Sequence, residues 1–293
     1  MAGGTSRERL VIAPAERRAS LIELIRSAQR SVSLSIFRCN DEAVLRALVD
    51  VAARGVRVRV IMTGRARHAK VALLQVQSYL SRQQVEVRRC PGDVKYHAKF
   101  AVIDERVAMV TSGNYTKKCF TRTADFMVLT GDPSVAQRLS ALFESDWSGR
   151  DVATPDGPHG RLIIGPSHAP RQRFEGLFWR ARRRIRLMDA KLDDPEMLAT
   201  LDAVRANGVT VDVRGERDLG PWEPHGKLLI IDDCLAVIGS MALSDRALSE
   251  RRELAVVVSD HELVRQLDAF WQSLPPVPPR WVSAPMPEAE AFA

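Results

Sequence analysis

Two short segments of the chain carry histidine, lysine and aspartate at identical spacing. They read YHAKFAVID at 96–104 and PHGKLLIID at 224–232. The matched residues are His97, Lys99 and Asp104 in the first segment and His225, Lys227 and Asp232 in the second. Side chains at i and i+2 of a strand point to the same face, so each histidine and its lysine can enter one pocket. The apolar runs that follow predict buried strands.

This set of side chains suits acid–base chemistry on a phosphate ester. Imidazole titrates near neutral pH, so one neutral and one protonated histidine can act together. Lys99 and Lys227 would stabilise negative charge on the phosphate oxygens, as metal ions do in other enzymes. A lone histidine of this kind would more often be a packed core residue. Two of them at equivalent places argue against coincidence, whereas the four other histidines lack this context and are expected at the surface.

A second apolar strand follows each motif and ends in small polar residues, TSGN at 111–114 and GSMA at 239–242. We expect Ser112, Asn114 and Ser240 to bind the phosphate oxygens. Asn114 aligns with Ala242, so the first half keeps the fuller set of donors. With the two histidine roles that the family resemblance described below implies, this asymmetry favours His97 as the nucleophile and His225 as the general acid.

The two motifs belong to an internal duplication. RLVIAP at 9–14 aligns with RLIIGP at 161–166, and the segments at 40–60 and 193–213 share the same pattern of apolar residues. Each half predicts an amphipathic helix, a strand, a helix capped by Asp41 or Asp194, and a β-branched strand after Gly55 or Gly208. Alternating strands and helices predict α/β sandwich halves related by a pseudo-two-fold axis, with one shared site between them.

We predict a first half at 1–150, a second half at 151–274, and a Pro-rich tail at 275–293 that forms an extended or disordered arm. The linker is expected at about 148–160, which is rich in Gly, Pro and Asp. Only the first half contains Arg65–Arg89, for which the pattern predicts an additional helix and a short strand.

The paired motifs resemble the phospholipase D superfamily, whose signature is H-x-K-x4-D followed by a G-S or S-x-N element. The resemblance covers the chain to about residue 273. It implies that two half-domains form one active site, that one histidine forms a covalent phosphohistidine, and that the other protonates the leaving alcohol without a metal or cofactor. It also implies that Asp125 and Glu253 orient the histidines, and that Asp104 and Asp232 are structural.

The composition of the chain indicates which partners and which location to expect for this chemistry. A net charge of +7 with a sequence pI near 9.6 favours an anionic partner, either phospholipid or nucleic acid. No run of residues is apolar and long enough for a membrane-spanning helix, so we expect a cytoplasmic protein with possible peripheral contact to a membrane. The four cysteines have neither metal-ligand nor paired spacing and are expected to be small buried residues. A monomer already supplies both half-sites.

The substrate remains open between two classes. Tyr96, Trp222 and the segment 65–89 could form an apolar channel, which favours a phospholipase D or phosphatidyltransferase of the cardiolipin-synthase kind. A compact site in basic surroundings also suits a nuclease, although the sequence has no module that reads nucleic acid and no series of stacking aromatic residues. A non-catalytic phosphate-binding module is the third reading, and the two intact motifs argue against it.

Overall fold

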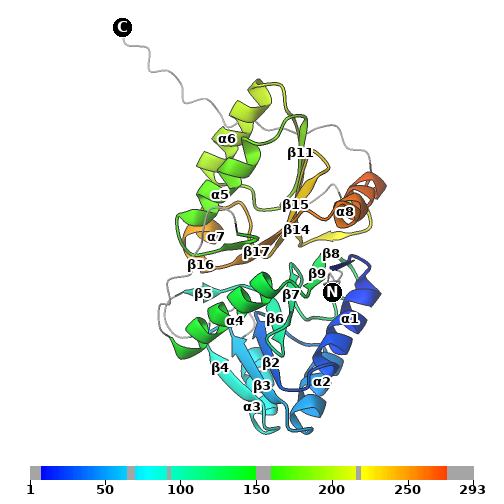
Figure 1. Ribbon diagram of the computed structural model, residues 1–293, viewed down its shortest axis with the longest axis vertical. Coiled ribbons are helices and arrows are strands. Elements are labelled where there is room, and N and C mark those ends of the chain that lie inside the picture. The colour runs from blue at the N-terminus through cyan, green and yellow to red at the C-terminus, as the bar shows by residue number, and fades with distance from the viewer. Residues whose placement is uncertain (1–7, 65–69, 91–93, 150–159, 216–218, 276–293) are drawn as a thin grey trace, which may run out of the picture.

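The computed structural model describes residues 8–64, 70–90, 94–149, 160–215 and 219–275, which form two similar halves stacked on each other (Figure 1). The predicted boundary at residue 150, most of the linker and residues 276–293 of the tail lie outside these ranges. The fold prediction is confirmed, because each half is a mixed sheet with helices, and the order of strands repeats.

The first half contains a seven-stranded sheet. Its order is β1 (Arg9–Val11), β9 (Met127–Thr130), β7 (Val107–Thr111), β6 (Phe100–Ile103), β2 (Ser31–Ile36), β3 (Arg57–Met62) and β4 (Glu86–Arg89). Strands β2, β3 and β4 are parallel to one another and the remaining pairs are antiparallel. The motif strand β6 therefore lies in the middle of the sheet, where both of its faces are covered.

The six-stranded sheet of the second half repeats this order without an equivalent of β4. Its strands are β10 (Leu162–Ile164), β17 (Leu254–Val258), β15 (Leu235–Gly239), β14 (Lys227–Ile231), β11 (Arg184–Met188) and β12 (Thr210–Arg214). The predicted helix and strand within Arg65–Arg89 are confirmed as α3 (Lys70–Ser81) and β4, which extend only the first half.

Helices cover the outer face of each sheet. The first sheet packs on α1 (Pro14–Arg26), α2 (Glu42–Ala52) and α3, and the second on α5 (Ala169–Phe178) and α6 (Pro195–Ala206). The predicted caps are confirmed, since Asp41 accepts from the N–H groups of Ala43 and Val44, and Asp194 from that of Met197. These bonds satisfy amide groups that the first turn of a helix leaves without partners.

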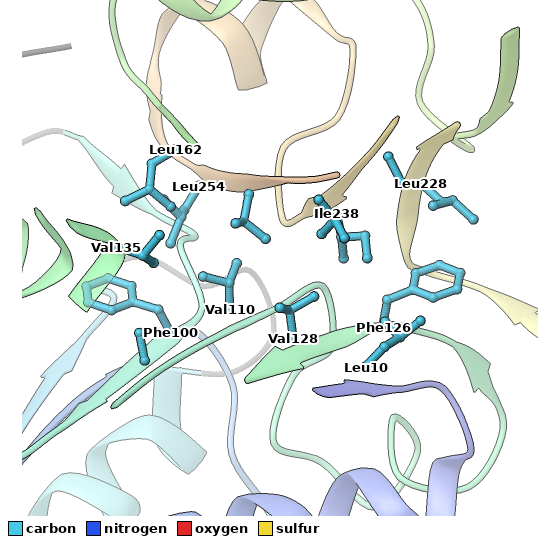
Figure 2. Close-up of a cluster of buried hydrophobic side chains, with 14 of the residues drawn as sticks. Leu10, Phe100, Val110, Phe126, Val128, Val135, Leu162, Leu228, Ile238 and Leu254 are labelled. Atoms are coloured by element: carbon cyan, nitrogen blue, oxygen red, sulfur yellow. The ribbon is translucent and has the colours of Figure 1, made fainter. Parts of the chain in front are cut away.

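The inner faces of the two sheets pack against each other. Figure 2 shows side chains of the first half, among them Phe100, Val110 and Val128, meeting Leu162, Ile238 and Leu254 of the second. Helices α4 (Pro133–Ser148) and α8 (His261–Ser273) add residues to the same cluster. Because this apolar layer joins the halves, it fixes the position of one motif relative to the other.

Asp104 and Asp232 hold the turns that follow the motif strands. Both have positive φ, 52° and 49°. Asp104 accepts hydrogen bonds from the backbone N–H groups of residues 29, 30 and 31, and Asp232 from those of residues 182, 183 and 184. Each carboxylate thus joins the motif hairpin to the start of the neighbouring strand, away from the histidine at the other end.

The cysteine prediction is only partly correct. All four cysteines are free, and Cys39 and Cys119 are buried, but Cys234 is exposed in the turn after β14. Within the described residues, no helix is both long and apolar enough to cross a membrane.

Candidate active site

Two short parallel sheets join the halves beside the motifs. In one, β5 (Lys95–Tyr96) pairs with β16 (Arg251–Arg252), and in the other, β8 (Thr123–Ala124) pairs with β13 (Glu223–Pro224). Each sheet pairs the residues just before a motif histidine with the residues just before an acid of the opposite half. The N–H of His97 donates to the carbonyl of Arg252 at 2.8 Å, and the N–H of Gly226 to that of Ala124 at 2.8 Å.

Both motif histidines therefore bond a carboxylate from the opposite half. Nδ1 of His97 lies 2.8 Å from Glu253, and Nδ1 of His225 lies 2.8 Å from Asp125. The sequence indicated these two acids but not which histidine each would serve. Because a carboxylate accepts at Nδ1, each ring turns its Nε2 atom away from the carboxylate, and Nε2 of His225 lies 3.1 Å from Nδ2 of Asn114.

Asp125 is held by four groups in a buried site. Its Oδ1 accepts from Ser112 at 2.7 Å as well as from His225, and its Oδ2 accepts from Thr123 and lies 3.4 Å from Nη1 of Arg17. The side chains of Arg17 and Asp125 are 2% and 0% exposed. Burial alone would raise the pKa of Asp125, but His225, Arg17 and Thr123 outweigh it and lower the pKa to about 2. Asp125 is thus ionised at neutral pH.

Arg17 was missed in the sequence analysis. It lies on α1, one turn before Leu21, and Nη2 donates to the carbonyl of Thr123 at 2.8 Å. The signal was a charged residue on the apolar face of an amphipathic helix, which needs a buried partner. The aligned position of the second half is Pro170, so Glu253 has no equivalent arginine from α5.

The imidazole of His97 is held in its neutral form. Burial lowers its pKa to about 3, although Glu253 acts in the opposite direction, and the charges of Lys99 and Lys227 lower it further. Because a charge in each half affects this ring, the two motifs share one electrostatic environment. The ring also meets Phe37 edge-on, with centroids 4.4 Å apart.

The motif lysines lie close to the backbone of their histidines. Nζ of Lys99 donates to the carbonyl of His97 at 2.7 Å, and Nζ of Lys227 donates to that of His225. Burial lowers the pKa of Lys99 to about 7, against the opposing effect of Glu253. Lys99 is therefore partly charged at neutral pH, and a bound anion would favour its charged form.

The two serines predicted as phosphate ligands each bond the acid of their own half, Asp125 for Ser112 and Glu253 for Ser240. The hydroxyl of Ser112 donates to Asp125, and that of Ser240 lies 3.3 Å from the carbonyl of Leu254. Both hydroxyl groups have protein acceptors within hydrogen-bond distance, so direct contact of these two serines with a phosphate stays a prediction.

Asn114 contacts the histidine of the other half. Its Nδ2 lies 3.1 Å from Nε2 of His225, and its Oδ1 is buried without a partner in the described residues. Placing Asn114 on the His97 side because the two share a half was therefore wrong, and the prediction that His97 is the nucleophile needs another basis. An amide can face an imidazole with either end, so Asn114 can donate to neutral His225 or accept from its protonated form.

A cavity of about 390 Å³ opens beside His225 and Asn114. Its wall includes Arg38 and Lys118 together with Ala72 and Leu73 of α3, so the additional helix reaches the site. The other two residues proposed for an apolar channel do not line this cavity. Tyr96 is fully buried in the layer between the sheets, and Trp222 packs against Phe270.

One group of side chains has the atom types of a metal site. Ligand atoms of Cys119, Asp125 and His225 lie within 4.8 Å of one another. Both oxygens of Asp125 already accept from protein donors, and Arg17 lies directly behind this carboxylate. A cation there would have to break these bonds against the charge of Arg17, so the donor set fits a charged histidine better than a metal ion.

Comparison with known proteins identifies the family of the chain. Residues 21–147 and 216–274 match the family model described as cardiolipin synthase, PLD-like domain. The chain is 31% identical over 134 residues to mitochondrial cardiolipin hydrolase of Xenopus laevis, covering 46% of this chain and 62% of that protein. It is 32% identical over 139 residues to cardiolipin synthase A of Pseudomonas aeruginosa strain LESB58, covering 46% of this chain and 28% of that protein.

The fold also matches a solved structure over most of its length. Phosphatidylserine synthase of Haemophilus influenzae superposes with a TM-score of 0.73 at 14% identity, covering 92% of this chain and 86% of that chain. At this level of identity the likeness shows the fold alone. The aligned region spans less than two thirds of either cardiolipin relative.

Proposed function

The chain belongs to the phospholipase D-like family, and on this premise we propose that it is a metal-independent phosphodiesterase or phosphatidyltransferase that acts on phospholipids. One observation carries the proposal. Two imidazoles from opposite halves each bond a buried carboxylate through Nδ1, beside a lysine that can face a phosphate. We also retain the division of the chain into halves at 1–150 and 151–274, each supplying one motif.

In the first step, Nε2 of His97 attacks phosphorus and forms a P–N bond. The bond to the leaving oxygen breaks, and this oxygen takes a proton from Nε2 of His225. In the second step, His225 removes a proton from water or an alcohol, whose oxygen attacks phosphorus and breaks the P–N bond. Water gives hydrolysis and an alcohol gives transfer, and both histidines return to their starting forms.

The surroundings of the two rings support this division of roles. The lowered pKa of His97 leaves its Nε2 lone pair available at neutral pH, as a nucleophile requires. Asp125, ionised and paired with Arg17, stabilises the imidazolium form of His225 that a general acid needs. Lys99 and Lys227 would stabilise charge on the non-bridging oxygens, with the amide of Asn114 as a further donor.

Three observations favour phospholipid as the substrate. The family model is that of a cardiolipin synthase domain, and relatives named as cardiolipin hydrolase and cardiolipin synthase align with nearly half of the chain. The cavity beside His225 combines apolar residues of α3 with basic residues, as a lipid phosphate and its chains require. The net charge of +7 is equally suited to nucleic acid, which is the second candidate.

The deciding experiment compares the two substrates without free metal. The protein is incubated in excess EDTA with phosphatidylglycerol vesicles and, in parallel, with single-stranded DNA. We expect headgroup release or cardiolipin formation with the DNA intact, and loss of lipid turnover in both His97→Ala and His225→Ala. DNA cleavage with intact lipid would favour the nuclease, whereas activity that EDTA abolishes, or that survives both substitutions, would refute the mechanism.

A further inference from the structure

The aromatic ring of Phe37 lies beside both the histidine and the lysine of the first motif. Phe37 directly follows β2 and is buried, with 7% of its surface exposed. Its ring meets the imidazole of His97 edge-on, with centroids 4.4 Å apart and an angle of 70° between the ring planes. Nζ of Lys99 lies over the same ring, 5.1 Å from its centroid. One apolar side chain is therefore adjacent to the proposed nucleophile and to a lysine proposed to face the phosphate.

Two further cations lie close to this ring. Cζ of Arg38 is 5.5 Å and Nζ of Lys95 is 5.6 Å from the ring centroid. These distances are within the roughly 6 Å at which the negative face of an aromatic ring attracts a cation. This attraction offsets part of the repulsion between the cations, and it adds no negative charge that would repel an anionic substrate.

The second half has a carboxylate at the end of the equivalent strand. Strand β2 pairs with the motif strand β6 in the same register as β11 pairs with β14. Residues 36–38 (Ile, Phe and Arg) therefore correspond to residues 189–191 (Asp, Ala and Lys). The position of Phe37 is thus occupied by Ala190, and an acid, Asp189, precedes it.

Asp189 is placed to stabilise the lysine of the second motif. It is 3% exposed, and its two oxygens accept from the N–H groups of Lys191 at 2.9 Å and Leu243 at 2.6 Å. It also lines a small cavity together with Lys227. Burial raises the pKa of Asp189, whereas Lys227, the two N–H groups and the charge of Lys191 favour its ionised form. The lysine of the second motif thus has a buried acid where the lysine of the first motif has an aromatic ring.

Charged groups of other elements also act on Lys99. Glu253 favours its charged form and Lys227 opposes it, with smaller effects of Asp125 and Cys119. Both acids already bond a motif histidine. The ring of Phe37 therefore stabilises Lys99 in addition to the acids that orient the histidines. Lys95, which shares the ring, is attracted by Glu253 and repelled by Arg38, Arg251 and Lys191.

We propose that Phe37 is a positioning residue of the reaction, whose ring orients the imidazole of His97 and keeps the ammonium group of Lys99 charged beside it. The inference rests on the proposed function and makes it more specific, because it gives a structural reason why two equivalent motifs have different roles. A neutral ring leaves positive charge at the place where the nucleophile meets an anionic phosphate. A carboxylate such as Asp189 suits the side on which an imidazolium acts as the general acid.

The charge of Lys99 is measured directly by NMR. The full chain, isotope-labelled at the Cε atoms of lysine, is titrated with base, and the signal of Lys99 is assigned by its absence in Lys99→Arg. Phe37→Leu keeps an apolar side chain without a π face, and Phe37→Tyr keeps the ring. We expect the pKa of Lys99, about 7 in the wild type, to lie about one pH unit lower in Phe37→Leu and to be unchanged in Phe37→Tyr. An unchanged or higher pKa in Phe37→Leu would overturn the proposal.

Phe143→Leu is the matched control. Phe143 is a fully buried residue of α4 whose ring also faces a cation, with Cζ of Arg59 at 5.2 Å. Its substitution should lower the melting temperature at least as much as Phe37→Leu and leave the titration of Lys99 unchanged. The same change of the Lys99 pKa in both variants would assign the effect to a looser core and overturn a specific role of Phe37. If Phe37→Leu does not fold, Phe37→Met takes its place, because methionine fills the space without a ring.

Turnover of a nitrophenyl phosphodiester provides a second readout. In Phe37→Leu, kcat at the optimal pH should fall about tenfold, and kcat/KM should begin its alkaline decrease at a lower pH, in step with the titration of Lys99. Phe37→Tyr should restore both. A wild-type kcat in Phe37→Leu would overturn the positioning role even if the pKa of Lys99 falls. Because the titration uses no substrate, an absence of phospholipid turnover by the wild type would count against the proposed function alone.

Discussion

Nδ1 of His97 lies 2.8 Å from Oε2 of Glu253, although the two residues belong to different halves of the chain. His225 and Asp125 form the reciprocal pair at the same distance. Neither half therefore contains a complete histidine–carboxylate pair. Each half supplies the acid that bonds the histidine of the other half. The short sheets β5/β16 and β8/β13 hold the acids in these positions.

The pairing of each acid with the histidine of the other half predicts which reaction step each acid affects. Asp125→Asn should impair His225, the proposed general acid, and so lower kcat by about 10²–10⁴-fold on alkyl phosphodiesters. The loss should be much smaller with a nitrophenyl ester, whose leaving group needs no proton. Glu253→Gln should impair both substrates alike, because it affects the nucleophile. Asp50→Asn, an exposed carboxylate, is the control. The opposite pattern would exchange the roles of the two histidines.

Arg17→Met should destabilise the protein by about 3–5 kcal/mol, because it leaves the buried carboxylate of Asp125 without its cation. The free energy of unfolding in urea measures the effect. Arg26→Met removes an ion pair with Asp50 in which both side chains are 57% exposed, and should cost less than about 1 kcal/mol. Equal effects of the two substitutions would show that Arg17 does not support Asp125.

Gly226→Ala should lower kcat by about 10²-fold, because a Cβ atom there would lie 2.3 Å from the carbonyl of Ala124 and displace His225 from Asp125. Steady-state kinetics and the melting temperature are measured together. Gly176→Ala is the matched control, since its Cβ meets nothing within 4 Å in α5, and it should stabilise the helix by about 0.5–1 kcal/mol. Full activity of the alanine variant at 226 would contradict the close approach.

The stability of the fold should depend on pH through His97. Its pKa falls from 6.5 to about 3 on folding, so below pH 6.5 the unfolded chain binds a proton that the folded chain does not. The free energy of unfolding therefore receives its full contribution from neutral His97 above pH 6.5, and this contribution is lost as the pH falls toward 3. The melting temperature of the wild type should therefore fall more steeply with decreasing pH over this range than that of His97→Asn. Parallel declines would contradict the lowered pKa.

Loss of the positive charge of Lys99 should account for part of the decrease in activity at alkaline pH. Its pKa of about 7 means that the free enzyme loses this charge as the pH rises above neutrality, and kcat/KM should fall with it. Lys99→Arg keeps its charge, so its profile should extend to higher pH even if its maximum is lower. A decrease in activity at the same alkaline pH in both proteins would assign that decrease to a group other than Lys99.

The sequence by itself determined the duplication, the two motifs, the helix caps and the additional α3–β4 segment. These features depend on residues close together in the chain. The i, i+2 spacing of His97 and Lys99 and the capping by Asp41 are local consequences of strand and helix geometry. The same spacing, together with the resemblance to a known family, was enough to indicate phosphodiester chemistry and the acids Asp125 and Glu253.

Only the tertiary structure decided how these groups combine. The packing of one sheet on the other brings Glu253 to His97, Asn114 to His225 and Arg17 to Asp125, and none of these pairs is close in sequence. Alignment of the halves even suggested the wrong histidine for Asn114, because it compares equivalent positions and contains no information on which surfaces meet. The docking of two apolar faces is a long-range property of the folded chain, and it determines the composition of the site.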